Sequence, residues 1–165
     1  GAVHLEVSLV RLDPGGSVVS HVHPFEESFY VLEGAGAFTV GDQAYRVHKG
    51  SFGFAPIRTP HRWVNDSDAP LLSIRTRSPQ ARQLGSGAGT YAVTHAVPDE
   101  IKRADVADGT RRFVGQFEED HMPEPGPIQM KGLRSPAARN VAVWMLVDEV
   151  IGAVHHTLFQ VRFDH

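Results

Sequence analysis

The first part of the chain alternates hydrophobic and polar residues over short stretches, a pattern typical of half-buried β-strands. Within residues 4–12, Leu5, Val7 and Leu9 alternate with polar residues before the pattern shifts. Further segments rich in β-branched and aromatic residues lie at 28–32, 37–40, 44–47, 51–55, 61–64 and 71–76. Turn-forming Gly and Pro residues separate them, and the Gly41-Asp42 step is typical of a two-residue hairpin. The spacing predicts an all-β antiparallel sandwich or barrel.

The sequence pattern changes after Arg77. Residues 78–90 are rich in Gly and Ser, which is typical of an exposed connection. A strand is predicted at 91–96, a weak helical pattern follows at 98–108, and residues 118–126 are acidic and then Pro-rich. We therefore expect a mostly irregular linker over 78–139 that has room for one strand and one short helix.

Strand-like patterns return near the end of the chain, at residues 140–147 and 155–163. Residues 155–164 match residues 4–13, with the same His, Arg and Asp at three corresponding positions. We therefore expect one barrel domain over 1–77 and extra C-terminal strands over 140–165. These strands either begin a second copy of the barrel or pair with a sheet edge, across a homodimer of this chain.

The composition narrows the classes of partner and site. The chain has 165 residues, a formal charge of −3 and no cysteine. The absence of cysteine excludes disulfides, thiolate nucleophiles and cysteine-ligated metals. The charge lacks the basic excess that nucleic-acid binding needs, and the apolar run at 141–147 is far shorter than the ~20 residues of a membrane span. We expect a cytoplasmic protein that binds neither nucleic acid nor membrane.

The candidate chemistry lies among the ten histidines. On an extended chain, residues two apart point to the same side, so His21 and His23 can share a metal ion. Glu27 follows after Pro24 and can turn its carboxylate back over these imidazoles, while His61 has to come from a distant strand. Three imidazoles and one carboxylate suit Mn, Fe, Ni, Co, Cu or Zn better than Ca or Mg, and leave coordination positions open.

The spacing of these residues resembles the two sequence motifs of the cupin superfamily. The first motif, G-x5-H-x-H-x3,4-E-x6-G, is filled by Gly15, His21, His23, Glu27 and Gly34. The second, G-x5-P-x-G-x2-H-x3-N, is filled by Gly50, Pro56, His61 and Asn65, with Arg58 where the pattern has Gly.

With the flanking strands, the resemblance covers about residues 4–77. It implies a cupin jelly-roll β-barrel, also called a double-stranded β-helix, whose mouth holds a metal ion on His21, His23, Glu27 and His61. The repeat at the C-terminus resembles a bicupin, a chain of two such barrels. The Arg58 departure puts a tight turn in question rather than the set of ligands.

Two functions remain open on the sequence, besides a metal-free structural barrel. One is a metal-dependent enzyme that acts on a small polar or carboxylate-bearing molecule, with Mn, Fe, Ni or Zn as Lewis acid or O₂ activator. Such an enzyme would be an oxidoreductase of the dioxygenase type, an aminohydrolase or an isomerase. The other is a non-catalytic module that binds a small ligand. Catalysis requires a proton carrier or a carboxylate anchor beside the metal, and the candidates are Arg58, Glu26 and Tyr30.

Overall fold

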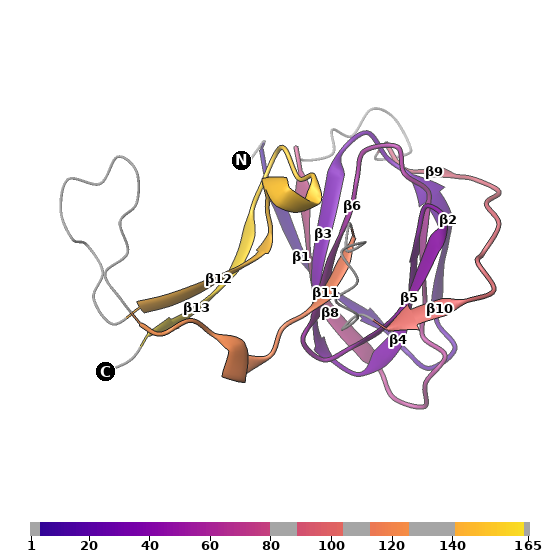
Figure 1. Ribbon diagram of the computed structural model, residues 1–165. Coiled ribbons are helices and arrows are strands. Elements are labelled where there is room, and N and C mark those ends of the chain that lie inside the picture. Colours follow the sequence, from indigo (N-terminus) through magenta and orange to yellow (C-terminus); the bar gives the residue numbers. More distant parts are fainter. Residues whose placement is uncertain (1–3, 80–88, 104–112, 126–140, 164–165) are drawn as a thin grey trace.

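The computed structural model describes residues 4–79, 89–103, 113–125 and 141–163, and its regular structure is almost entirely β (Figure 1). Eight strands form the first half of the chain: β1 Glu6–Leu12, β2 Ser17–Val22, β3 Glu26–Glu33, β4 Ala35–Val40, β5 Gln43–His48, β6 Ser51–Ala55, β7 His61–Val64 and β8 Leu71–Ser78. The hairpin predicted at Gly41-Asp42 joins β4 to β5, with Val40 paired to Gln43. Gly41 has a φ of 55°, a left-handed conformation that glycine adopts without a steric penalty.

Shorter elements follow in the second half. They are the strands β9 Tyr91–Ala92, β10 Ile101–Arg103, β11 Val114–Gln116, β12 Val141–Val147 and β13 Leu158–Phe163, and the short 3₁₀ helices η1 Glu119–His121 and η2 Glu149–Ile151. Within the described ranges of the chain, no helix is long and apolar enough to cross a membrane.

Two sheets make up the barrel. One has the strand order β1-β8-β3-β6-β11 and the other the order β10-β5-β4-β7-β2-β9. The strands pair antiparallel except where β10 joins β5 in parallel. The two sheets face one another around a common core (Figure 1). The all-β class and the jelly-roll barrel expected from the sequence are confirmed.

The core is built from side chains that point inward from both sheets. Its centre is an aromatic group in which the Phe29 ring lies 4.6 Å from the Trp63 ring and 4.8 Å from the Phe38 ring, both edge to face. Trp63 is fully buried. Aromatic side chains bury more apolar area than other residues, and this packing fixes the spacing of the two sheets.

The segment predicted as a linker contributes to the barrel. β9 pairs with β2, β10 with β5 and β11 with β6, so these strands extend the sheets. β10 and β11 make only three residue pairs each, which need no alternating apolar pattern and leave little trace in the sequence. β9 is the first part of the strand predicted at 91–96. Of the weak helical pattern at 98–108, residues 101–103 form a strand, and 104–112 lie outside the described residues.

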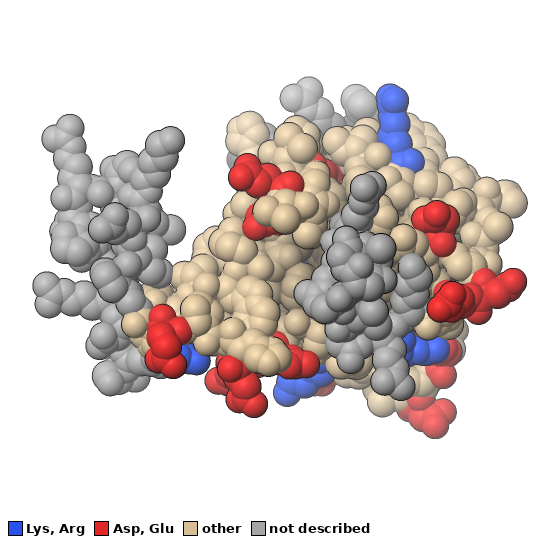
Figure 2. All heavy atoms as spheres, viewed as in Figure 1, with Lys and Arg blue, Asp and Glu red and all other residues tan. Residues whose placement is uncertain are grey.

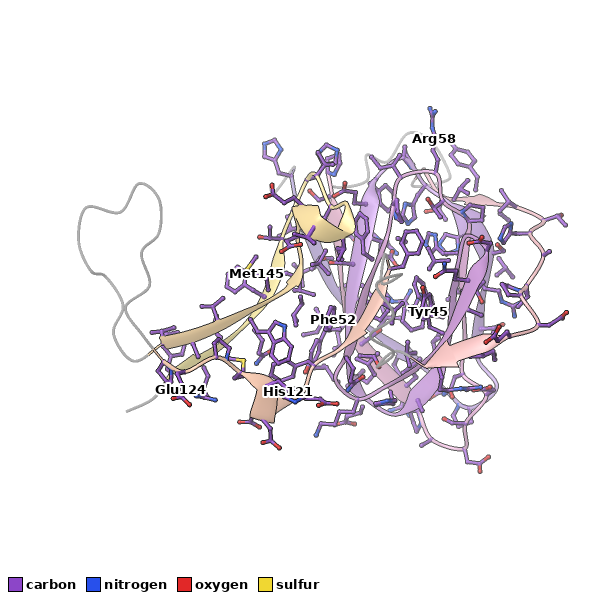
Figure 3. All side chains as sticks on the ribbon, in the orientation of Figure 1. Tyr45, Phe52, Arg58, His121, Glu124 and Met145 are labelled. Atoms are coloured by element: carbon purple, nitrogen blue, oxygen red, sulfur yellow. The ribbon has the colours of Figure 1, made fainter. Side chains whose placement is uncertain are left out.

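The C-terminal strands β12 and β13 pair with each other in a separate two-stranded sheet. This hairpin packs on the outside of the barrel, where Phe52 and Phe54 of β6 form one apolar cluster with Leu146 and Val147 of β12. Phe52 points from the barrel toward the hairpin (Figure 3). The hairpin therefore covers a sheet face, not the sheet edge predicted above, because its apolar side chains pack on β6. The second barrel and the homodimer stay predictions.

Candidate metal centre

Neighbouring strands bring three histidines together at one end of the barrel interior. β2 pairs with β7 so that His21 lies directly opposite His61, and His23 follows just after β2 ends. Metal-ligating ring nitrogens of the three residues all lie within 4.8 Å of one another. The ring centroids are 4.1 Å apart for His21 and His61 and 4.6 Å apart for His23 and His61. Two strands far apart in sequence thus supply one group of ligands.

Backbone carbonyl groups fix the orientation of all three rings. Each Nδ1 lies within hydrogen-bond distance of a carbonyl oxygen: His21 with Val19 at 2.8 Å, His23 with Phe25 at 2.6 Å and His61 with Thr59 at 2.9 Å. A carbonyl oxygen only accepts, so each Nδ1 carries the proton and donates, which leaves Nε2 with its lone pair. The Nε2 atoms of His23 and His61 are buried and have no hydrogen-bond partner in the described part of the chain. These Nε2 lone pairs are therefore available to bind a metal ion.

Burial also keeps the imidazoles of His23 and His61 neutral. Desolvation lowers the pKa of His61 to about 4, although the Glu27 carboxylate acts in the opposite direction. Burial likewise lowers the pKa of His23. A metal ligand has to be deprotonated, so these two residues are in the ligating form at neutral pH.

Glu27, on β3, lies beside the histidines but is held by two arginines. Its Oε2 accepts a hydrogen bond from Arg77 Nε at 2.9 Å, and its Oε1 lies 3.6 Å from Arg75 Nη1. The same Oε2 is 3.9 Å from His23 Nε2. Burial alone would raise the pKa of Glu27, but the guanidinium groups of Arg75 and Arg77 outweigh burial and lower it. The group within 4.8 Å therefore contains the histidines, with an ionised carboxylate next to it.

Two of the proposed catalytic residues lie on the other side of the barrel wall. Successive residues of a strand point to opposite faces, so Glu26 and Tyr30 face outward where Glu27 faces inward. The Glu26 carboxylate accepts the backbone N–H groups of Val154 and His155, each at 2.9 Å. The Tyr30 ring packs 6.3 Å from that of Phe117. The structure does not bring Glu26 or Tyr30 to the histidines.

The third candidate, Arg58, lies in the turn before β7. Its side chain is exposed and extends away from the end of the barrel (Figure 3). Its backbone has a φ of 61°, the left-handed conformation that favours glycine, and its N–H donates to the His23 carbonyl at 2.9 Å. The tight turn therefore forms even though Arg58 replaces the Gly of the motif, and Arg58 adopts the left-handed conformation.

Sequence reasoning missed Arg75 and Arg77 of β8. Arg75 is only 3% exposed, and its Cζ lies 4.5 Å from the centre of the Trp63 ring. The available signal was their spacing: two arginines two residues apart in a strand share a face. Arginine is rarely fully buried unless it is paired, so the spacing alone did not place these side chains in the interior.

Charged side chains are spread over the surface without a basic cluster in the view of Figure 2. Among the described residues on that face, Lys and Arg occur at separate points, and Asp and Glu lie over both the barrel and the hairpin. The described residues of this face therefore form no basic patch of the kind that binds a phosphate backbone.

Comparison with known proteins gives the family. Residues 8–74 match the family model described as cupin domain. An uncharacterized protein of Methanocaldococcus jannaschii is 36% identical over 58 residues, which are 34% of this chain and 46% of that protein. The chain thus spans about half the length of the curated relative that it matches.

Solved structures of other proteins are similar to about half of this chain. The protein TT1209 of Thermus thermophilus is 30% identical, with 48% of this chain and 76% of that chain covered and a TM-score of 0.46. An uncharacterized conserved protein with a double-stranded β-helix domain from Klebsiella pneumoniae is 20% identical, with 56% and 77% covered and a TM-score of 0.48. With the family match over residues 8–74, the barrel is a cupin domain, and the chain belongs to the cupin superfamily.

Proposed function

We propose that the barrel binds one divalent transition-metal ion through His21, His23, His61 and Glu27, and that it is an enzyme acting on a small polar or carboxylate-bearing molecule. The observation that carries this proposal is the group of three imidazoles within 4.8 Å, with every Nδ1 bonded to a carbonyl. A metal-ligating histidine usually donates its other ring N–H to a group such as a backbone carbonyl. This hydrogen bond fixes the tautomer and the orientation of the ring.

The residues around this group support the same function. The Phe25 ring stacks on His23 at a centroid distance of 3.9 Å and is buried, which limits access of water to that side. Arg75 and Arg77 keep Glu27 ionised and therefore able to act as the anionic ligand. Three imidazoles and one carboxylate suit Mn, Fe, Ni or Zn. When bound, such an ion supplies a Lewis acid or a site for O₂, which suits dioxygenase, aminohydrolase or isomerase chemistry.

The metal part of the proposal is tested by titrating Zn²⁺ into metal-free protein and following the heat of binding. We expect about one equivalent to bind to the native protein, and His61→Ala to lose most of that binding because one ligand is removed. Exposed His48, outside the group, gives the control variant His48→Ala. Binding to His61→Ala as tight as to His48→Ala would rule out this site.

One observation favours the non-catalytic alternative, a cupin module that binds a small ligand. The candidate proton carriers Glu26 and Tyr30 face away from the histidines, and Arg58 is exposed. The two functions differ in turnover. Metal-loaded protein that consumes O₂ or converts a small carboxylate in a substrate screen supports the enzyme, whereas saturable binding without conversion supports the module.

A further inference from the structure

Two buried N–H groups inside the barrel have no acceptor among the described residues: Nη2 of Arg75 and Nε1 of Trp63. The two side chains are stacked, with Arg75 Cζ 4.5 Å from the centre of the Trp63 ring. Trp63 is 0% exposed and Arg75 is 3% exposed. Buried donors in folded proteins nearly always have a partner, so these two N–H groups are available to an acceptor that the described residues do not supply.

The remaining atoms of the Arg75 guanidinium are engaged, which leaves Nη2 as the available donor. Nη1 lies 3.6 Å from Glu27 Oε1, and Nε donates to Ser73 Oγ at 3.5 Å. Through Glu27 the guanidinium adjoins the histidines, because Glu27 Oε2 is 3.9 Å from His23 Nε2. The unpartnered donors therefore lie in the same interior as the candidate metal centre.

The charges in this interior indicate the kind of acceptor. Arg75 balances the charge of Glu27, and Arg77 divides its contacts between Glu27 and Glu6. A divalent ion on the histidines would leave the interior with a net positive charge. Uncompensated charge is unfavourable in a medium of low dielectric constant, so a bound anion is favoured there.

We propose that Arg75 and Trp63 form a binding site for the carboxylate group of a small organic anion, beside the metal centre. A carboxylate offers two acceptor oxygens in one plane, which suits a guanidinium N–H together with an indole N–H. The location beside a metal rests on the proposed function, whereas the two unpartnered donors do not depend on it. The site narrows the ligand class from small polar molecules to carboxylates.

Trp63 itself reports on this site. The chain has two tryptophans, so Trp144→Phe leaves Trp63 as the sole indole fluorophore. Acetate is titrated into this metal-free protein at constant ionic strength, with acetamide as the uncharged probe of the same shape, and both titrations are repeated after loading with Zn²⁺. Arg75→Lys in this background keeps the charge beside Glu27 but removes the planar fork. The matched control is Arg46→Lys, which alters an arginine paired with Asp66 on the surface.

We expect acetate to change Trp63 fluorescence saturably in the metal-free protein and acetamide to leave it unchanged. Loss of a hydrogen bond to a charged group should weaken acetate binding to Arg75→Lys by roughly ten- to a hundredfold, with Arg46→Lys unaffected. An unsaturable acetate signal in the parent protein, or equal responses to acetate and acetamide, overturns the inference without any need for the Arg75 variant. Equal acetate affinity in a folded Arg75→Lys protein overturns it as well.

The two proposals fail separately in this experiment. Protein that binds acetate through Arg75 but takes up no Zn²⁺ supports the carboxylate site and overturns the proposed metal function. Protein that takes up Zn²⁺ but gives no saturable acetate signal, with or without the metal, overturns the carboxylate site and leaves the metal function standing.

Discussion

Replacing Glu26 with Gln should loosen the C-terminal segment from the barrel. The Glu26 carboxylate is 3% exposed and accepts the backbone N–H groups of Val154 and His155, each at 2.9 Å. These two bonds join β3 to the segment between η2 and β13. Glutamine retains one acceptor oxygen, but its NH₂ group faces the second backbone N–H and cannot accept from it.

The size of the effect follows from these two bonds. Hydrogen bonds to a charged group contribute about 1.5–3 kcal/mol each, and a neutral one contributes about 1 kcal/mol. One bond is lost and the other becomes neutral, so we expect the free energy of docking to fall by about 2–5 kcal/mol. If the segment opens locally, its amide hydrogens should exchange roughly thirty- to five-thousandfold faster than in the native protein.

Hydrogen exchange measured on peptides from residues 148–163 tests this expectation. Peptides from β4 and β5 of the same sample report on the barrel and should stay protected. The control variant is Glu33→Gln, which removes an exposed carboxylate from the same strand. Exchange should not depend on protein concentration, because the partner of the segment is its own barrel.

Two results would contradict this reasoning. Exchange in Glu26→Gln that matches Glu33→Gln would mean that the two hydrogen bonds do not hold the segment. Protection that increases with protein concentration would mean that the segment docks on a neighbouring copy, as in the homodimer expected from the sequence.

Three further predictions concern pH and the turn before β7. Three unperturbed imidazoles would lower the Zn²⁺ affinity roughly thousandfold between pH 7.5 and 5.5. Because the pKa of His61 is about 4 and that of His23 is lowered, the affinity measured by calorimetry should fall by much less. A thousandfold fall would contradict the burial of these two rings. The pKa of Glu27 is lowered from 4.5, so the ionised carboxylate stabilises the fold above pH 4.5. This stabilisation is lost as the pH falls through the lowered pKa. The free energy of urea unfolding should therefore depend less on pH in acid for Glu27→Gln than for the native protein, and an equal dependence would refute this. Arg58→Gly should raise the free energy of unfolding by about 0.5–1 kcal/mol, because glycine adopts the left-handed conformation at φ 61° without strain. The melting temperature should rise accordingly. An unchanged or lower melting temperature would show that contacts of the Arg58 side chain offset this strain.

The local parts of this structure were accessible from the sequence. Alternation of side chains along a strand and the backbone preferences of glycine and proline act over a few residues, so the barrel strands and the Gly41-Asp42 turn could be predicted. The same short-range geometry places His21 and His23 on one side of an extended chain. The spacing of His21, His23, Glu27 and His61 also pointed to the cupin superfamily, to which the chain belongs.

The elements without a local pattern became visible only in the fold. β10 and β11 are held by a few backbone pairs with β5 and β6, and those pairs depend on which strand lies alongside. The C-terminal hairpin could be predicted as strands, but its position on the face of β6 follows from apolar side chains that meet across the fold.

The chemistry of the candidate centre depends on contacts between residues far apart in the chain. His61 reaches His21 only because β7 pairs with β2, and the desolvation that lowers its pKa comes from side chains packed around it. Arg75 is buried because it stacks on Trp63 and faces Glu27 from another strand. The sequence determined which side chains share a strand face, and the tertiary structure decided which faces meet, because burial and charge pairing depend on distances in space.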